Sequence, residues 1–306
     1  MTAPLLMIVF NRPDTTAEVF RAVRDYAPRQ LFVAQDGPRR GTGEAGRCQA
    51  VRAIVEGVDW ECDVRYLYRD QNLGCGRAVS EAVTWFFEHV EEGVILEDDC
   101  VPASDFFRYC EELLERHRND ERVWMVSGVN LLGTWRERDA SYFFADGGVW
   151  GWATWRRAWK HMDLRPAAWH DPASRARARE FLGDDLWNVV MPELERVFRG
   201  ELDTWDYQWL FVRASHGGAG AIPSGNLVRN IGFGEDATHT TAVATPYNRL
   251  STSTLVGPLR HPPDVVVDRR YLARVVGKRR QYARWLGARR RLRSLGRLGR
   301  EETARR

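Results

Sequence analysis

Residues 72–99, NLGCGRAVSEAVTWFFEHVEEGVILEDD, contain a glycine-rich loop, a helix pattern and a strand pattern in direct succession. Apolar residues recur along one helical stripe between Ala78 and Val90, which predicts an amphipathic helix. Residues 93–96 then form a continuous apolar run of strand length. A helix that leads directly into a buried strand is typical of α/β proteins with a mainly parallel sheet.

The same alternation extends over the first 130 residues. Further apolar runs of strand length occupy residues 5–10, 31–34, 64–68 and 123–126. Helix patterns lie between them over 15–26, where Thr15 and Glu18 form a plausible capping box, over 44–58, and from Ser104 onward. This alternation predicts βαβ units and a mainly parallel sheet flanked by helices.

The pattern changes after residue 130. Residues 131–250 are rich in Trp, Gly and Asp, with a strand predicted over 142–145 and one or two helices over 183–216. Residues 251–306 begin as a proline-containing linker and end in a basic amphipathic helix pattern. We therefore expect residues 1–130 and 131–250 to be two halves of one domain, followed by a linker and a helical tail.

Charge is distributed unevenly along the chain. The net charge of the 306 residues is +3, but residues 269–306 hold 14 Arg and one Lys against two Glu, which gives them +13. The rest of the chain is an acidic body with a net charge of −10. The tail could lie on an anionic membrane surface, bind nucleic acid or another acidic partner, or pack against the body. We favour the membrane surface, and the acidic body argues against nucleic acid.

Three features predict a cytoplasmic location, with or without a peripheral contact of the tail at the inner face of the membrane. No stretch approaches the roughly 18 uncharged apolar residues that a membrane span needs. The N-terminus shows no basic region and no small-residue cleavage site of a secretory signal. The five Cys form no Cys-x-x-Cys pair, so we expect neither a disulfide framework nor a zinc ribbon.

Polar residues follow four of the predicted strands, where open α/β sheets bind their ligands. These strand ends carry Asn11-Arg12, Asp36-Gly37, residues 72–77 and Glu97-Asp98-Asp99. Three consecutive carboxylates raise one another's pKa unless a cation neutralises them, and oxygen ligands suit Mg²⁺ or Mn²⁺. The alternative is that these acids cap the next helix or face the solvent.

The loop from Asn72 through Gly74 to Arg77 opens the predicted helix. Backbone N–H groups at such a helix start suit a phosphate, and Arg77 could contact a diphosphate directly. The alternative is a glycine turn beside a surface arginine. Val79 stands where a dinucleotide fingerprint needs its third glycine, and no Gly-x-x-x-x-Gly-Lys-Ser/Thr motif occurs, so we expect neither an NAD site nor a P-loop.

In their joint order these motifs resemble those of GT-A fold glycosyltransferases, which use nucleotide-sugar donors. The chain is similar to the bacterial nucleotide-diphospho-sugar transferases called hemolytic-protein-like. Its Glu-Asp-Asp motif also resembles that of the animal N-acetylglucosaminyltransferase that initiates complex N-glycans. The motifs are Phe10-Asn-Arg-Pro13, Gln35-Asp-Gly37, Asn72-Leu-Gly74, Leu96-Glu-Asp-Asp99, Trp150-Gly-Trp-Ala-Thr-Trp155, Thr204-Trp-Asp-Tyr-Gln-Trp209, and Ile231-Gly-Phe-Gly234 with His239.

The resemblance covers about residues 5–240 and implies a GT-A, Rossmann-like fold. Residues 1–130 would bind the nucleotide-sugar, and residues 131–250 would bind the acceptor and carry the catalytic base. Asp206 would be the general base that deprotonates an acceptor hydroxyl, with inversion at the anomeric carbon. Asp99 would ligate a Mn²⁺ or Mg²⁺ ion that bridges the diphosphate, and His239 would add a metal or phosphate contact.

The same resemblance implies the contacts to the donor. Asn11 and Arg12 would surround the nucleotide, and Asp36 would contact the base or the ribose. Asn72, Gly74 and Arg77 would lie near the diphosphate. Glu97 of the acidic motif would also contact the donor, and Asp98 would lie at the ribose. Two local alternatives stay open. Asp203 competes with Asp206 as the base, because it lies three residues away on the same predicted helical face. Trp150, Trp152 and Trp155 form either a sugar-stacking platform or part of the core.

The sequence therefore predicts a metal-dependent, inverting hexosyl- or N-acetylhexosaminyltransferase with a UDP-sugar as the expected donor. The acceptor could be a glycan, a lipid-linked glycan or a small molecule. One competing function is a non-catalytic scaffold that binds nucleotides or glycans. Another is a sugar-nucleotide pyrophosphorylase, which would need a glycine- and arginine-rich loop ending in Pro-Lys. Asn11-Arg12-Pro13 stands there instead, and no lysine precedes Lys160.

Overall fold

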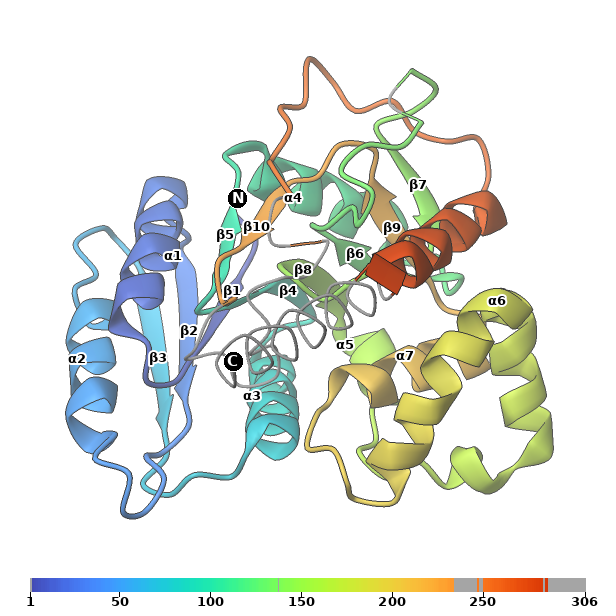
Figure 1. The fold of residues 1–306 in the computed structure, drawn as a ribbon. Helices are drawn as coiled ribbons and strands as arrows, with labels where there is room; N and C mark the ends of the chain where they lie inside the picture. The colour runs from blue at the N-terminus through green and yellow to red at the C-terminus, as the bar shows by residue number, and fades with distance from the viewer. Residues whose placement is uncertain (1, 137, 234–246, 248–249, 283, 286–306) are drawn as a thin grey trace, which may run out of the picture.

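The computed structural model describes residues 2–136, 138–233, 247, 250–282 and 284–285. Its centre is an eight-stranded sheet with the order β3-β2-β1-β4-β8-β6-β9-β7, and a smaller sheet pairs β5 with β10 (Figure 1). The strands are β1 (Leu5–Val9), β2 (Gln30–Gln35), β3 (Asp63–Tyr68), β4 (Glu92–Glu97), β5 (Cys100–Pro102), β6 (Val123–Ser127), β7 (Tyr142–Ala145), β8 (Trp152–Trp155), β9 (Ala219–Pro223) and β10 (Val228–Asn230).

Helices cover both faces of the large sheet. They are α1 (Pro13–Tyr26), α2 (Ala45–Val55), α3 (Cys75–His89), α4 (Asp105–His117), α5 (Arg156–Trp159), the 3-10 helix η1 (Ala167–His170), α6 (Pro172–Phe198) and α7 (Asp206–Ser215). Residues 269–282 are also helical. Helix α6 is kinked at Gly183, whose φ of 76° is readily adopted only by a residue without a Cβ.

The sheet is mainly parallel. Strands β3, β2, β1 and β4 are parallel neighbours, and β6 pairs in parallel with β9. Strand β8 is inserted antiparallel between β4 and β6, and β7 is antiparallel to β9 at the edge. Six of the eight strands therefore run the same way. This confirms the predicted α/β fold with a mainly parallel sheet flanked by helices.

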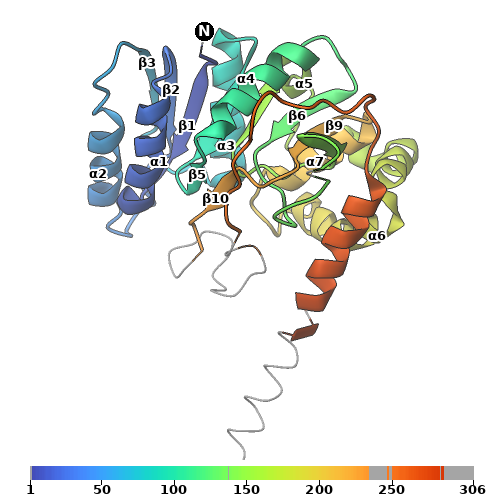
Figure 2. The ribbon, with the colours of Figure 1, turned by 90° about the horizontal axis from the view of Figure 1, so that it is seen from above.

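Two cores lie on the two faces of the sheet because successive strand residues point to opposite sides. In β1, Leu5, Met7 and Val9 pack with α1, α2 and α4, whereas Leu6 and Ile8 pack with α3, α5 and α7 (Figures 1 and 2). All five residues of β1 are buried. A strand covered on both faces has no polar side, which is why its sequence is an unbroken apolar run.

A third core lies between α6, α7 and the helix at residues 269–282. Tyr271, Leu272, Val275 and Val276 of this C-terminal helix are buried in it. Of the three interpretations of the basic tail, packing against the body therefore holds for residues 269–282. Residues 286–306 lie outside the described part of the chain. None of the helices that the structure describes has the length and hydropathy needed to cross a bilayer.

Strand β8 has no counterpart among the predicted strands. Its four residues, WATW, are all buried, but Thr154 interrupts what would otherwise be a continuous apolar run. Trp152 and Trp155 are 0% and 2% exposed and belong to the core. Of the three tryptophans considered for sugar stacking, Trp150 lines a cavity that is described below.

Candidate functional site

The direction of sheet growth reverses at β1, where β2 and β3 lie on one side and β4 on the other. The loops after β1 and β4 lie side by side at the carboxyl ends of these strands, where the backbone of Phe10 contacts Asp98. Open α/β sheets bind their ligands at this position. Arg12 follows β1 and directly precedes α1. Helix α1 begins at Pro13, two residues before the predicted capping box, because proline fits the first helical position. Glu97 ends β4, and Asp98 and Asp99 follow it. We call these three acids the acidic cluster.

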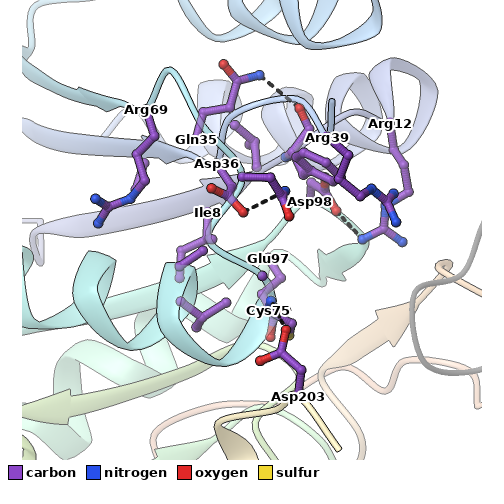
Figure 3. A pocket seen from close by; sticks show the side chains of 17 residues that line it. Ile8, Arg12, Gln35, Asp36, Arg39, Arg69, Cys75, Glu97, Asp98 and Asp203 are labelled. Atoms are coloured by element: carbon purple, nitrogen blue, oxygen red, sulfur yellow. Dashed lines mark hydrogen bonds and ion pairs between the residues drawn. The ribbon is translucent and has the colours of Figure 1, made fainter. Parts of the chain in front are cut away.

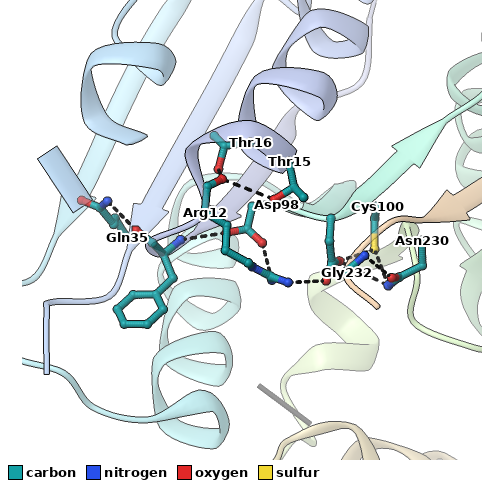
Figure 4. A network of polar contacts seen from close by, with 10 residues as sticks. Arg12, Thr15, Thr16, Gln35, Asp98, Cys100, Asn230 and Gly232 are labelled. Carbon is teal, nitrogen blue, oxygen red and sulfur yellow. Dashed lines mark hydrogen bonds and ion pairs between the residues drawn. The ribbon is translucent and has the colours of Figure 1, made fainter. Parts of the chain in front are cut away.

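The guanidinium of Arg12 binds both aspartates of the acidic cluster (Figure 4). Its Nη2 lies 2.5 Å from Oδ1 of Asp98, and its Nη1 lies 3.0 Å from Oδ2 of Asp99. The backbone N–H of Phe10 donates to the other oxygen of Asp98 at 3.1 Å. Burial lowers the pKa of Arg12, but the two carboxylates raise it by more, so the side chain stays charged. Arg12 is therefore the counter-ion of two of the three acids.

The carboxylate of Glu97 has less compensation from positive charge than those of Asp98 and Asp99. No residue in the described ranges donates a hydrogen bond to its carboxylate. Burial, together with the charges of Asp99 and Asp98, raises its pKa. Oδ1 of Asp99 accepts weaker hydrogen bonds from Nδ2 of Asn230 and from the thiol of Cys100, each at 3.3 Å. Three carboxylates and one guanidinium leave an excess of negative charge, which a further cation would stabilise.

The residues present fit a divalent cation that binds together with a diphosphate. Within the described ranges, no three His, Cys, Asp or Glu side chains form a ready-made metal site. An ion shared with phosphate groups usually takes only one or two protein carboxylates, and water and phosphate oxygens complete its shell. Glu97 and Asp99 line the same cavity and can supply such oxygens. His239, the other predicted ligand, lies outside the described residues.

Cavity 1 has a volume of about 300 Å³ and lies between the ends of β1 and β2 and the start of α3 (Figure 3). Asp36 directly follows β2, and its carboxylate is hydrogen-bonded to the loop after β3. Its carboxylate accepts hydrogen bonds from Nδ2 of Asn72 at 2.8 Å and from the N–H of Leu73 at 3.0 Å. Burial raises the pKa of Asp36, and the hydrogen bond from the N–H of Leu73 opposes the shift. The structure thus brings Asp36, Asn72 and Gly74 together at cavity 1.

Gly37→Ala should disturb this wall of cavity 1. A Cβ at position 37 would lie 2.4 Å from the backbone nitrogen of Gln71, and backbone cannot move aside as a flexible side chain can. We expect the free energy of unfolding to fall by about 1–3 kcal/mol, measured by chemical denaturation. Gly46→Ala is the control, because nothing lies within 4 Å of its Cβ and alanine favours the helix. If Gly37→Ala and Gly46→Ala lower the free energy of unfolding equally, the contact of position 37 with the backbone of Gln71 does not determine stability.

The N-terminus of α3 is occupied by a carboxylate of the protein itself. Oδ2 of Asp203 lies 2.8 Å from the backbone nitrogen of Cys75, and Oδ1 lies 3.0 Å from that of Gly76. The first N–H groups of a helix lack intrahelical partners and attract anions, and Asp203 satisfies two of them. This corrects the prediction that the glycine-rich loop offers these N–H groups to a phosphate.

Two of the predicted donor contacts lie away from the cavities. Arg77 is largely exposed, and its Nε donates to Glu81 one helical turn later at 2.6 Å. Asn11 is buried, and its Nδ2 donates to Oε1 of Glu44 at 2.9 Å. Neither residue lines any of the cavities. In the structure Arg77 is thus a surface arginine and Asn11 is hydrogen-bonded to Glu44, and their contacts with a donor stay predictions.

Two arginines outside the predicted set line cavity 1. Arg39 pairs with Glu44 at 2.6 Å, and its guanidinium lies over the ring of Phe10 at 5.4 Å. Arg69 pairs with Glu81 at 2.8 Å. Arg39 lies four residues after β2, and Arg69 directly follows β3. Their position beyond the carboxyl ends of parallel strands is the signal that could have identified them.

Cavity 2 has a volume of about 530 Å³ and adjoins cavity 1, because Arg12, Cys75 and Glu97 line both. Asp99 lines cavity 2 from the acidic cluster, and Trp150 lines it from the loop before β8. The two cavities therefore form a continuous site, with Arg12 and the acidic cluster where they meet.

Asp206, the first residue of α7, also lines cavity 2. Its Oδ1 accepts hydrogen bonds from the N–H of Tyr207 at 3.0 Å and from the hydroxyl of Thr204. Its Oδ2 has no donor among the residues that the structure describes. Asp206 is therefore held in position through one oxygen while the other is available to a ligand.

No family model and no curated protein matches this chain. Among solved structures, it is similar to the mannosyltransferase PcManGT from Pyrobaculum calidifontis in complex with GDP-Man and Mn²⁺. That match has 20% identity over 51% of this chain and 46% of the other, with a TM-score of 0.35. It is also similar to HddC from Yersinia pseudotuberculosis, with 8% identity over 47% of this chain and 60% of the other, and a TM-score of 0.28. The chain thus spans about half the length of these structures.

Proposed function

We propose that the chain is an inverting glycosyltransferase that moves a sugar from a nucleoside diphosphate donor to an acceptor hydroxyl. One observation supports this most strongly: Arg12 and the acidic cluster stand between two adjoining cavities, at the point where sheet growth reverses. Doubly wound sheets bind nucleotides at such switch points. The second cavity contains Asp206, a carboxylate with one oxygen available.

Cavity 1 would hold the nucleoside, beside Asp36 and Asn72 and between Arg39 and Arg69. The diphosphate would then lie near Arg12, at the junction of the cavities. Negative charge develops on the diphosphate as its bond to the sugar breaks, and a guanidinium already fixed by two carboxylates can offset it without reorganisation. We take UDP-sugars as the first donors to test, with hexoses and N-acetylhexosamines as the transferred groups.

Cavity 2 would hold the sugar and the reacting hydroxyl. The acceptor oxygen attacks the anomeric carbon from the side opposite the diphosphate, and the bond from that carbon to the diphosphate oxygen breaks. The hydroxyl proton passes to Oδ2 of Asp206, and the nucleoside diphosphate leaves with the bonding electrons. Attack from the opposite side inverts the configuration of the anomeric carbon.

A Mn²⁺ or Mg²⁺ ion, held by Asp99 with Glu97 beside it, belongs to this proposal. When bound, such an ion supplies positive charge to the departing diphosphate. Asp98 is fully engaged by Arg12 and the N–H of Phe10, so it fixes Arg12 and is not a second metal ligand. His239 remains a predicted ligand.

Calorimetric titration of UDP-, GDP-, dTDP- and CDP-sugars, with and without Mn²⁺, tests the donor site. We expect one nucleotide class to bind in the presence of Mn²⁺. Asp99→Asn should weaken that binding by about 10–100-fold, the range typical when a metal site loses a supporting group. Asp184→Asn is the matched control, because Asp184 pairs with Arg179 on the surface.

Two results would contradict the proposed donor site. In one, none of the four nucleotide classes binds. In the other, binding is the same without Mn²⁺ and in Asp99→Asn, which would make the acidic cluster purely structural. Tight donor binding without any turnover would favour the scaffold hypothesis over the transferase.

Membrane contact through the tail and a lipid-linked glycan acceptor remain predictions. Much of the basic charge of the tail belongs to residues 286–306, outside the described ranges. Residues 269–282 pack on the body through one face of their helix, and Arg270, Arg274 and Arg280 are exposed.

A further inference from the structure

The chain that follows β10 crosses the acidic cluster. Strand β10 pairs with β5 in the register Asn230↔Cys100, and the N–H of the next residue, Ile231, donates to the backbone oxygen of Asp99 at 2.8 Å. Figure 4 shows Asn230 and Gly232 beside Cys100, at the end of the Arg12 side chain. Asn230 and Gly232 also line cavity 2 together with Asp99. A segment far along the sequence therefore lies against the acid that is proposed to hold the metal ion.

Asn230 holds one oxygen of the Asp99 carboxylate. The orientation of the Asn230 amide is fixed, because its Oδ1 accepts the backbone N–H of Gly232 at 2.8 Å. Its Nδ2 therefore faces Asp99 and donates to Oδ1 of that residue at 3.3 Å. This hydrogen bond is longer than the usual value of about 2.9 Å, so it orients Oδ1 and leaves this oxygen able to bind a cation as well.

Gly232 leaves room for the other oxygen of Asp99. Oδ2 pairs with Nη1 of Arg12 at 3.0 Å, and the backbone of Gly232 passes directly over this ion pair. A Cβ at position 232 would overlap Oδ2 of Asp99 and lie 2.9 Å from Nη1 of Arg12. Any residue with a side chain would therefore displace Asp99, Arg12 or both. The Asp99 carboxylate is thus held at Oδ1 by Asn230 and at Oδ2 by Arg12, beneath Gly232.

We propose that Asn230 and Gly232 are positioning residues for Asp99, and that Oδ1 is the oxygen that Asp99 offers to the metal ion. The inference rests on the proposed function, in which Asp99 holds Mn²⁺ or Mg²⁺ at the diphosphate. The charge of Arg12 compensates Oδ2, whereas the donors to Oδ1 in the described ranges, the amide of Asn230 and the thiol of Cys100, are uncharged. A cation therefore stabilises Oδ1 more than Oδ2.

Calorimetric titration of inorganic pyrophosphate, with and without Mn²⁺, tests this role without any choice of nucleotide. Mn²⁺ should tighten the binding of pyrophosphate to the wild-type chain. Asn230→Ala removes the support of Oδ1, so it should weaken binding in the presence of Mn²⁺ by about 10–100-fold, the range typical when a metal ligand loses a supporting group. Without Mn²⁺, pyrophosphate should bind through Arg12, and Asn230→Ala should change its affinity by less than about twofold.

Gly232→Ala acts on the other oxygen and should have a different signature. The added methyl group displaces Asp99 or Arg12, so pyrophosphate binding should weaken both with and without Mn²⁺, each by at least about tenfold. Thermal unfolding shows whether each variant is folded, and if Gly232→Ala is not, Asn230→Ala decides alone. Asn119→Ala and Gly277→Ala are the matched controls, because Asn119 is exposed and nothing lies within 4 Å of a Cβ at position 277. Neither control should change pyrophosphate binding.

The outcomes separate this inference from the proposed function. A folded Asn230→Ala variant that binds pyrophosphate with Mn²⁺ as tightly as the wild type overturns the inference. So does an equal loss with and without Mn²⁺, because Asn230 would then support the fold of the site and not the metal ligand. Wild-type binding of pyrophosphate that Mn²⁺ does not change also overturns it. In each of these cases the titration of the wild-type chain with nucleotide-sugars decides the proposed function separately, since binding of a donor supports that function and no binding contradicts it.

Discussion

Asp206→Asn should lower the rate of sugar transfer by about 10²–10⁴-fold, the contribution typical of a positioned general base. Asparagine keeps the shape of the side chain but cannot take up the hydroxyl proton. The structure supports this choice of residue, because Oδ1 of Asp206 is held by Thr204 and Tyr207 while Oδ2 has no donor among the described residues. Initial rates of nucleoside diphosphate release measure the effect, and calorimetry should show donor affinity changed by less than about twofold.

Asp203→Asn is the control for this prediction, because Asp203 is the competing base. Its two oxygens cap α3 through Cys75 and Gly76, and asparagine retains only one acceptor oxygen. We expect stability to fall by about 0.5–2 kcal/mol, as for other lost helix caps. The transfer rate should fall far less than in Asp206→Asn. If Asp203→Asn abolishes transfer and Asp206→Asn does not, the base is Asp203.

Arg12→Gln should be the most destabilising single change at the site. It removes the counter-ion of Asp98 and Asp99, whose side chains are only 3% and 14% exposed. Breaking a buried ion pair by removing one partner typically costs about 3–5 kcal/mol, because the remaining charge is left uncompensated. Urea unfolding measures the loss, and donor binding should also be lost, because Arg12 stands where the two cavities meet.

Two further variants test the reason for that loss. Arg12→Gln combined with Asp98→Asn should recover part of the stability, since it removes one of the uncompensated charges. Arg118→Gln breaks the surface pair of Arg118 with Glu92 and should cost less than about 1 kcal/mol. A similar loss in Arg12→Gln and Arg118→Gln, or no recovery in the double variant, would show that charge compensation is not the role of Arg12.

Five of the six parallel strands of the large sheet could be predicted from the sequence, because they are short apolar runs separated by helix patterns. The sixth, β9, has no predicted counterpart. Strands β1, β2, β3, β4, β6 and β7 all lie where the sequence predicts strands. Strand β8 is not predicted, because Thr154 interrupts the apolar residues of its WATW sequence and its tryptophans also suit a sugar-stacking loop. Its antiparallel pairing with β4 and β6 depends on contacts far apart in the chain.

Some features of the candidate site could likewise be predicted from the sequence, and others could not. The acidic cluster could be predicted because consecutive carboxylates after an apolar strand are unusual and costly. The capping of α3 by Asp203 could not, because it joins residues 128 positions apart. The pairing of Arg77 with Glu81 follows a local four-residue spacing, so it could have been predicted from the helix pattern alone.

A crystal structure with the nucleotide-sugar that binds best, together with Mn²⁺, tests the central claim most directly. We predict the nucleoside in cavity 1 beside Asp36, the diphosphate at Arg12, and the sugar in cavity 2 with its anomeric carbon facing Asp206. A donor bound anywhere else, or a diphosphate that contacts neither Arg12 nor Asp99, would contradict the proposed transferase site.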